Sequence, residues 1–494
     1  MTVLYLALDQ GTSSSRAMLF DARGQVVATE QAALASSYPG PGWVEQDPEH
    51  IWRTSLGVCQ AVLAQAPSGA DVRAMGITNQ RETVVLWDRA TGEALAPAIV
   101  WQDRRTADDC AALRADGVEP MLQARTGLLA DPYFSATKIR WLLDHVPGAR
   151  RRAEAGELAI GTVESFLMAR LTGGRRHVTD ATNASRTLLF DIHRGAWDDD
   201  LLRLFAVPAA LLPEVVDNAG DLGVADSRWF GRHLPITGLA GDQQSALIGQ
   251  ACLQAGMAKS TYGTGCFMLI NTGATAPLST HRLLGTVAYR IDGRMTYGLE
   301  GSIFAAGVAV QWLRDKLGIL PSAAASEAIV RRRGGDARGV VLVPAFVGLG
   351  APHWNADARG IVSGLTLDSD ADDLIVATLQ SVAFQTGDLL RAAAGDGAAP
   401  DVLRVDGGMV ANGWLCQFLA DVLERPVERP AVTETTALGA AMLAALGVGD
   451  VSGLEELGGW WSPEQRFEPA MEPARRATLL AGWDRAVARA LVPG

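Results

Sequence analysis

The stretch LALDQGTSSSRAMLF, residues 6–20, decides the fold. The apolar run over residues 3–8 predicts a strand, Gly11-Thr12-Ser13-Ser14 predicts a tight turn, and residues 16–20 predict the returning strand. A second turn leads into a third predicted strand over residues 26–29. The chain is therefore predicted to open with a β-meander whose first bend contains glycine and hydroxyl side chains.

A similar hairpin is predicted about half a chain length further on. Residues 258–262 and 267–271 flank the turn Gly263-Thr264-Gly265, so both hairpins bend at a Gly-Thr pair. A further strand pair is predicted over residues 286–290 and 295–299. The repeated pattern indicates that the two halves of the chain are built alike.

Helices are predicted between these strands. The apolar residues of 375–390 recur every three to four positions, and a helix over 437–446 is predicted to end at Gly447. Strands and helices in both halves predict an α/β protein, and 494 residues suit two large domains. We place these domains at residues 1–250 and 251–494.

The composition excludes several classes of protein. The formal net charge is −12, whereas a nucleic-acid or anionic-membrane binder needs a basic surface. The 5 cysteines are scattered and form no CxxC pair, so neither a disulfide framework nor a structural zinc is expected. The N-terminus lacks the basic region of a signal peptide, and no apolar stretch approaches the roughly 20 residues of a membrane-spanning helix. We therefore expect a cytoplasmic protein without an integral membrane segment.

The first hairpin has the chemistry of a phosphate site. No Walker P-loop is present, because Ala258 stands where the nearest match requires glycine. In residues 9–16, glycine lets a phosphate approach the backbone, and hydroxyl and N–H groups can donate to its oxygens. Asp9 can hold a hydrated Mg²⁺, and Arg16 can neutralise charge on a transferring group. The alternative is a tight hairpin whose hydroxyls satisfy only its own backbone.

Two further segments fit a nucleotide. Residues 261–265 repeat the phosphate chemistry in the second half of the chain. Residues 405–412 predict a strand end, a Gly-Gly turn and a helix start, where an adenosine can lie against bare backbone. Because these segments and the first hairpin lie in opposite halves, they indicate a ligand held in a cleft between domains.

A carboxylate suited to act as a base is also present. Phosphoryl transfer to a hydroxyl needs a carboxylate that orients the hydroxyl and accepts its proton. Asp242 follows an apolar, glycine-containing segment and precedes an amphipathic run, so it is a candidate for this role. The alternative is that Asp242 caps the N-terminus of a helix, which aspartate does commonly.

Other side chains can bind a polyol. The adjacent Arg81 and Glu82 can donate to and accept from a diol, and a surface salt bridge worth about 0–1 kcal/mol is the alternative. Trp101, Tyr133 and Phe267 are candidates for an aromatic wall against a carbon backbone. Isolated aromatic residues also occur in hydrophobic cores, so spacing alone does not separate these two roles.

Taken together, the motifs resemble those of the FGGY carbohydrate kinases over nearly the whole chain. Several blocks match in order, which is more specific than any single block. They are LALDQGTSSSRA, PGWVEQDP, GITNQRET, IVWQDRR, DPYFSATKIRW, VTDATNASRT, AGDQQSAL, TYGTGCFML, RVDGGMVAN, TALGAA and AGWDRAVARA.

The resemblance implies a fold, a reaction and a set of roles. The fold would have two actin-like (ribonuclease H-like) domains with a catalytic cleft between them. The reaction would use ATP and Mg²⁺ to phosphorylate glycerol to sn-glycerol 3-phosphate, with Asp242 as general base. The residues expected at the polyol are Arg81, Glu82, Trp101, Tyr133, Asp242, Gln243 and Phe267. Those expected at the phosphates or nucleoside are Thr12, Ser13, Ser14, Arg16, Thr264, Gly307, Gln311, Gly408 and Asn412, with Asp9 and Asp242 near the metal.

Two alternatives to this reaction stay open. One is a kinase of the same family that acts on a ketopentose or another sugar, although GITNQRET, DPYFS and GCFML favour a three-carbon pocket. The other is an actin-like ATPase, although such a protein needs no base aimed at a hydroxyl. The sequence departs from the family pattern at His353, where tyrosine is usual, and at Leu367, where arginine is usual. The resemblance also implies a homo-oligomer, either a dimer or a tetramer.

Overall fold

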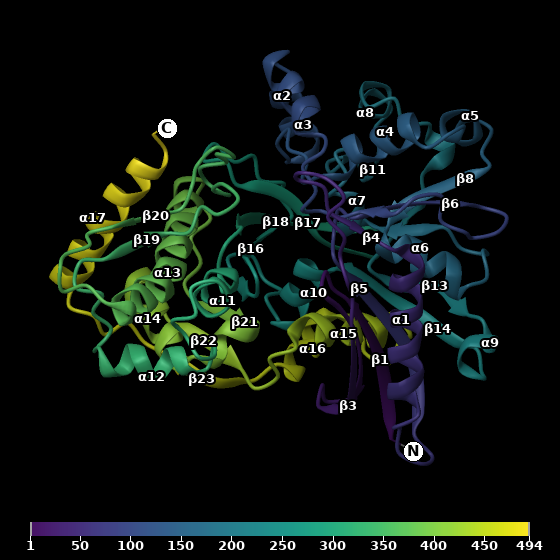
Figure 1. Cartoon of the computed structure of the whole chain (residues 1–494). Helices are drawn as coiled ribbons and strands as arrows, with labels where there is room; N and C mark the ends of the chain where they lie inside the picture. The colour runs from purple at the N-terminus through teal and green to yellow at the C-terminus, as the bar shows by residue number, and fades with distance from the viewer. Residues whose placement is uncertain (1, 493–494) are drawn as a thin grey trace.

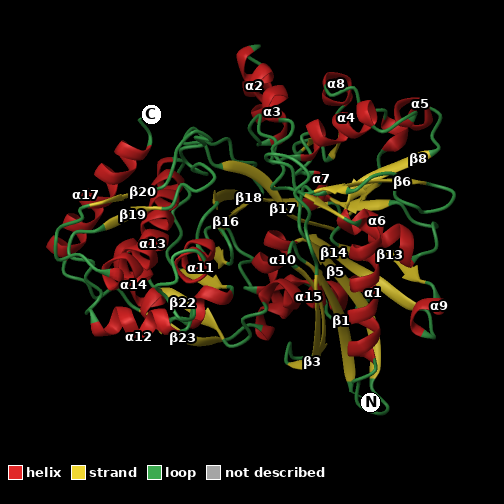
Figure 2. Cartoon of the chain, in the orientation of Figure 1, coloured by secondary structure: helices red, strands yellow, loops and turns green. Residues whose placement is uncertain are grey.

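The computed structural model describes residues 2–492 and contains two large sheets with helices packed against them (Figure 1, Figure 2). The first sheet has the strand order β13-β14-β5-β1-β2-β3, and the second has the order β17-β18-β16-β15-β21-β22-β23. The strands of the first sheet are β1 Val3–Gln10, β2 Ser14–Asp21, β3 Val26–Ala33, β5 Asp71–Asn79, β13 Ala219–Ala225 and β14 Leu234–Gly241. Those of the second are β15 Ala258–Tyr262, β16 Cys266–Gly273, β17 Leu284–Ile291, β18 Arg294–Ile303, β21 Leu403–Asp406, β22 Val427–Pro430 and β23 Pro463–Phe467.

Helices and shorter strands complete both halves. The helices of the first half are α1 Pro48–Leu63, α2 Ala107–Ala115, α3 Glu119–Thr126, α4 Ser135–His145, α5 Ala149–Glu154, α6 Val163–Leu171, α7 Ala181–Ala184, α8 Asp199–Leu204, α9 Ser227–Phe230 and α10 Asp242–Gly249. Those of the second half are α11 Gly307–Asp315, α12 Ala325–Arg332, α13 Ala371–Gly395, α14 Gly413–Leu423, α15 Thr435–Gly447, α16 Leu454–Leu457 and α17 Pro473–Ala490. A four-stranded sheet joins β4 Glu45–Gln46, β6 Val84–Asp88, β7 Ala98–Ile99 and β8 Leu158–Thr162. Three strand pairs are formed by β9 Val178–Asp180 with β12 Glu214–Val216, β10 Phe190–Asp191 with β11 Ala196–Trp197, and β19 Val341–Val343 with β20 Ile361–Ser363.

The two large sheets share one plan. In the first, β1 pairs antiparallel with β2 and parallel with β5, which pairs parallel with β14. In the second, β15 pairs antiparallel with β16 and parallel with β21, which pairs parallel with β22. The predicted hairpins and their Gly-Thr bends are thus confirmed as equivalent elements of two sheets. The α/β fold with two actin-like domains, expected from the sequence, is confirmed.

Helix α15 belongs to the second half of the sequence but packs on the first sheet. It contacts β1, β5, β14 and α10 (Figure 1). Its residues share a buried cluster with Ala7, Ala240 and Leu247. The predicted end of this helix at Gly447 is confirmed, but Gly447 is the last helical residue and the C-cap is Val448, so the prediction that glycine caps the helix is wrong. A Cβ on Gly447 would lie 2.1 Å from the Thr237 carbonyl oxygen, so this glycine permits close packing on β14.

The contact between α10 and α15 brings two helix backbones together. A Cβ on Gly249 would lie 1.9 Å from the carbonyl oxygen of Thr435, and a Cβ on Gly439 would lie 1.8 Å from that of Ser245. The Ser245 hydroxyl also donates to the carbonyl of Thr436 at 2.7 Å. Only glycine permits this approach, so α15 fixes the position of α10.

A membrane-spanning helix needs about 20 predominantly apolar residues. No helix within residues 2–492 has both the required length and the required apolar character.

Candidate active site

One cavity of about 430 Å³, named the polyol cavity after this prediction, is lined by all the residues predicted to contact a polyol. The first half of the chain contributes most of the lining, and the second half contributes Thr261, the Gly-Thr-Gly turn and Phe267. The predicted residues on its wall are Thr12, Ser13, Arg81, Glu82, Trp101, Tyr133, Asp242, Gln243, Thr264 and Phe267. The cavity therefore lies between the two halves, as a cleft site requires.

A second cavity of about 500 Å³ adjoins the first. This cavity, named the nucleoside cavity, is lined by the residues predicted to hold a nucleoside, namely Gly307, Gln311, Gly408 and Asn412. Gly263 and Thr264 line both cavities, so the turn of the second hairpin lies where the two meet. An ATP molecule with its nucleoside in the second cavity would direct its phosphates past this turn towards the first.

Asp242 is the first residue of α10 and faces the polyol cavity. The alternative that Asp242 is the helix N-cap is wrong, because Gly241 occupies that position and makes no side-chain cap. One carboxylate oxygen accepts from the Gln243 N–H at 2.7 Å and lies 3.1 Å from the Nε of Arg81. Burial raises the pKa of Asp242, and the positive charges of Arg81 and Lys259 oppose this effect. A carboxylate with a raised pKa is a stronger base.

Arg81 and Glu82 are not a surface salt bridge, so that alternative is wrong. Both side chains are only 2% exposed, and the Nε of Arg81 lies 3.9 Å from the nearest Glu82 oxygen. Glu82 has a φ of 61°, and the Thr83 N–H donates to the Arg81 carbonyl at 2.7 Å, which is the pattern of a γ-turn. The turn lies just after β5 and directs both side chains into the cavity wall.

Two fully buried residues that the sequence analysis did not single out complete a ring of charges with this pair. Glu300 on β18 accepts from Arg81 at 2.5 Å and from Arg186 at 2.8 Å, and Arg186 donates to Glu82 at 2.7 Å. Burial raises the pKa of Glu300, but Arg186 and Arg81 outweigh it and hold this pKa at about 2. One signal was available, because Glu300 is a lone acid in the largely apolar run Tyr297–Phe304.

Lys259 on β15 is a third residue that the motif analysis missed. It is fully buried, and its ammonium group donates to Gln243 and, at 2.9 Å, to the Thr261 hydroxyl. Burial lowers the pKa of Lys259, and the charges of Asp406 and Asp242 counteract this. Lys259 thus supports Gln243 and Thr261, both of which line the first cavity.

The three aromatic candidates lie together on the lining of the first cavity. The Trp101 ring lies 5.6 Å from that of Tyr133 and 6.0 Å from that of Phe267, both edge to face. The indole N–H of Trp101 donates to the Thr12 hydroxyl at 2.8 Å. The apolar wall is thus joined directly to the first phosphate hairpin.

Three predicted residues of the first hairpin do not line either cavity. The Ser14 hydroxyl accepts from Gln31 at 2.9 Å, and Arg16 pairs with Glu434. Asp9 stands opposite Arg16 in the β1–β2 register. Burial raises the pKa of Asp9 to about 7, with Arg16 opposing and the negative charge of Asp242 adding to the rise.

The donors near Asp9 suit Mg²⁺, which prefers oxygen ligands and usually takes one or two carboxylates plus phosphates. Asp242 is the second carboxylate predicted near the metal, and its negative charge contributes to the raised pKa of Asp9. The buried hydroxyl of Thr78, which neighbours Asp9 in the β1–β5 register, has no hydrogen-bond partner among the described residues. No cluster of three or more His, Cys, Asp or Glu side chains suited to a metal occurs within residues 2–492. A metal here would therefore take its other ligands from phosphate oxygens and water.

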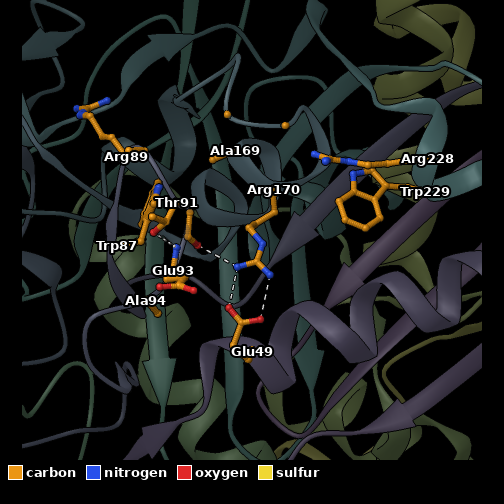
Figure 3. A pocket seen from close by; sticks show the side chains of 14 residues that line it. Glu49, Trp87, Arg89, Thr91, Glu93, Ala94, Ala169, Arg170, Arg228 and Trp229 are labelled. Carbon is orange, nitrogen blue, oxygen red and sulfur yellow. Dashed lines mark hydrogen bonds and ion pairs between the residues drawn. The ribbon is translucent and has the colours of Figure 1, made fainter.

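A larger cavity of about 750 Å³ lies elsewhere on the first half and is not this site (Figure 3). Its Arg170 binds both carboxylate oxygens of Glu49, at 2.7 and 2.9 Å. Arg89 is engaged by backbone carbonyls, including that of Leu158. None of the predicted site residues lines this cavity, and its Glu49, Arg89 and Arg170 side chains already have partners.

The two departures from the family pattern lie outside the cavities that meet at Thr264. His353 lines a separate cavity of about 370 Å³. Leu367 is fully exposed, in the loop between β20 and α13. Neither substitution alters the wall of the polyol or the nucleoside cavity.

Comparison with known proteins agrees with this geometry. Residues 4–249 and 258–448 match the N-terminal and C-terminal domain models of the FGGY family of carbohydrate kinases. The chain is 61% identical over 485 residues to glycerol kinase from Rhodospirillum centenum, covering 98% of this chain and 97% of that protein. Among solved structures it is similar to Plasmodium falciparum glycerol kinase with ADP, with a TM-score of 0.92, 35% identity and 99% coverage of each chain. Xylulose kinase from Rhodospirillum rubrum is also similar, with a TM-score of 0.83, 26% identity and coverage of 98% and 97%. The family models match most of the chain and the first relative is far above 30% identical, so the chain belongs to the FGGY family of carbohydrate kinases.

Proposed function

We propose that the protein is an ATP-dependent kinase that phosphorylates glycerol to sn-glycerol 3-phosphate. The observation that supports this most is the junction at Gly263 and Thr264 between a cavity suited to a small polyol and a cavity suited to a nucleoside. The high identity to glycerol kinase from Rhodospirillum centenum supports the choice of glycerol.

In this proposal the side chains of the first cavity hold the polyol and activate one hydroxyl. Arg81 and Glu82 donate to and accept from neighbouring hydroxyls, while Trp101 and Phe267 pack against the carbons. Asp242 accepts the proton of the attacking hydroxyl, whose oxygen bonds to the γ-phosphorus as the bond to the β-phosphate oxygen breaks and ADP leaves. Mg²⁺, held with phosphate oxygens near Asp9 and Asp242, would neutralise charge on the transferring group.

The deciding experiment measures ADP release with MgATP and a panel of substrates. The panel contains glycerol, dihydroxyacetone, erythritol, xylulose, ribulose, gluconate and a blank without substrate. Turnover strongest with glycerol is expected. Preference for a ketose would move the assignment to a ketopentose kinase, and turnover in the blank alone would indicate an actin-like ATPase.

The two halves are proposed to divide the substrates between them. Residues 1–250 supply most of the polyol site and the first phosphate hairpin, and residues 251–494 supply the nucleoside site. Residue 1 and residues 493–494 lie outside the described part of the chain. A cytoplasmic location and a dimer or tetramer stay predictions, and size-exclusion chromatography with light scattering tests the second.

Substitutions in the two cavities are expected to separate the two substrates. Phe267→Ala removes an apolar wall and should raise the KM for glycerol roughly tenfold, since each polyol CH₂ group buried against it is worth about 0.8 kcal/mol and about 1.4 kcal/mol is a tenfold change. Gln311→Ala, in the nucleoside cavity, should raise only the KM for ATP. Initial rates with each substrate varied in turn measure both effects. If either variant changed both KM values equally, this division of the cavities would be wrong.

Asp9→Asn is expected to raise the Mg²⁺ concentration for half-maximal activity roughly tenfold or more, because one carboxylate near the cation is lost. The KM for glycerol should stay within about twofold, because Asp9 does not line the polyol cavity. Asp71→Asn, at the far end of the neighbouring strand β5, is the matched control. An unchanged Mg²⁺ titration in Asp9→Asn would remove Asp9 from the proposed metal site.

A further inference from the structure

The charge ring of Arg81, Glu82, Arg186 and Glu300 has an inner and an outer half. Arg81 and Glu82 line the polyol cavity, whereas Arg186 and Glu300 do not. The outer pair is fully buried, and each member contacts both its ring neighbours through separate atoms. Glu300 uses one oxygen for Arg81 and the other for Arg186, so its carboxylate fixes the spacing between the two guanidinium groups.

The inner half of the ring contains a backbone conformation that neighbouring contacts must stabilise. A non-glycine residue at positive φ in a γ-turn is rare and costs about 1–3 kcal/mol, so surrounding contacts must maintain it. Glu82 has this conformation, with a φ of 61°. Arg186 holds its side chain at 2.7 Å, and the Ser135 hydroxyl donates to its carbonyl at 3.1 Å. Arg186 thus holds the side chain of Glu82, and Ser135 holds its backbone.

The ring also joins the two halves of the molecule without reaching the nucleoside cavity. Arg81, Glu82 and Arg186 come from the first half, and Glu300 comes from β18 of the second sheet. None of the four lines the nucleoside cavity. A substitution that disrupts the ring should therefore weaken polyol binding and leave ATP binding unchanged.

We propose that Arg186 and Glu300 are positioning residues that set polyol affinity and discrimination by holding Arg81 and Glu82, without contacting the polyol themselves. This inference rests on the proposed function. A ring that served only stability would be an ordinary buried ion-pair network, whose loss destabilises the fold but leaves the ratio between substrates unchanged.

The test compares Glu300→Gln with the wild-type protein in steady-state kinetics and thermal unfolding. Glu300→Gln is expected to raise the KM for glycerol roughly tenfold to a hundredfold, the scale of a misplaced binding group. The KM for ATP should stay within about twofold, and the preference for glycerol over erythritol and dihydroxyacetone should fall by the same factor as the affinity. Glu300→Asp, which keeps the charge but shortens the reach, should show an intermediate effect.

Asp373→Asn is the matched control, because Asp373 is a fully buried carboxylate paired with an arginine, Arg338, and neither residue lines either cavity. It should lower the unfolding temperature without changing either KM. If Glu300→Gln does not fold, Arg186→Lys is measured in its place and should show the same polyol-selective loss. Equal changes in both KM values, or a change in stability alone as in the control, would overturn the positioning role. Absence of glycerol turnover in the wild type would instead refute the proposed function.

Discussion

Asp242→Asn is expected to lower turnover with glycerol by roughly 10²–10⁴, the usual scale for loss of a general base. Asparagine keeps the size of the side chain and can still accept from the Gln243 N–H, so α10 should begin at the same residue. It cannot take up the proton of the attacking hydroxyl. The contact between Asp242 and the Nε of Arg81 at 3.1 Å also loses its charge, so a moderate rise in the KM for glycerol is expected.

Single-turnover kinetics with saturating glycerol and MgATP measure this effect directly. Calorimetry with ADP in the absence of Mg²⁺ should give an unchanged affinity, because Asp242 does not line the nucleoside cavity. Asp221→Asn is the control and should keep full turnover, because Asp221 is an exposed carboxylate on β13, the strand paired with β14. Near-normal turnover in Asp242→Asn would exclude Asp242 as the base.

Gly439→Ala is expected to destabilise the protein by about 1–3 kcal/mol or more, which is the cost of overpacking a tight contact. The added methyl group would lie 1.8 Å from the Ser245 carbonyl oxygen, so α15 and α10 must separate. Because α10 begins with Asp242, the same shift should displace the proposed base and lower activity in the folded fraction.

Denaturant unfolding of Gly439→Ala and of Gly57→Ala tests this prediction. Gly57 is exposed on α1 and has no atom within 4 Å of the place that a methyl group would take, so alanine there should be neutral or stabilise by about 0.5–1 kcal/mol. If Gly439→Ala unfolded at the wild-type denaturant concentration, the backbone contact between the helices would not matter for stability.

The sequence allowed prediction of the elements whose signals are local. The hairpins around Gly11 and Gly263 follow from apolar runs separated by turn residues, and both were confirmed. The site residues in recognisable blocks, such as Arg81 and Tyr133, lie on the predicted cavity. The local sequence pattern did not distinguish a buried charged side chain from an exposed one, so it did not predict the ion-pair partners of Arg81 and Glu82.

Features that depend on contacts between distant segments were not predicted. The charge ring joins residues 82, 186 and 300, and no local spacing relates them. The role of Gly447 was misjudged for the same reason, because this last residue of α15 permits close packing on the distant Thr237 and is not the helix cap. Arg16 was expected at a phosphate, yet its nearest acid is Glu434, which lies just before α15 in the sequence.

The packing of α15 on the first sheet has a consequence for biosynthesis. The ribosome releases the strands of that sheet early, but residues 435–447, which cover one of its faces, emerge near the end of translation. Until then the apolar side chains around Ala7 and Leu247 are not packed against α15, and chaperones can bind them. The nascent N-terminal half should therefore remain sensitive to protease until nearly the whole polypeptide has been made, and the two halves should reach their final state together.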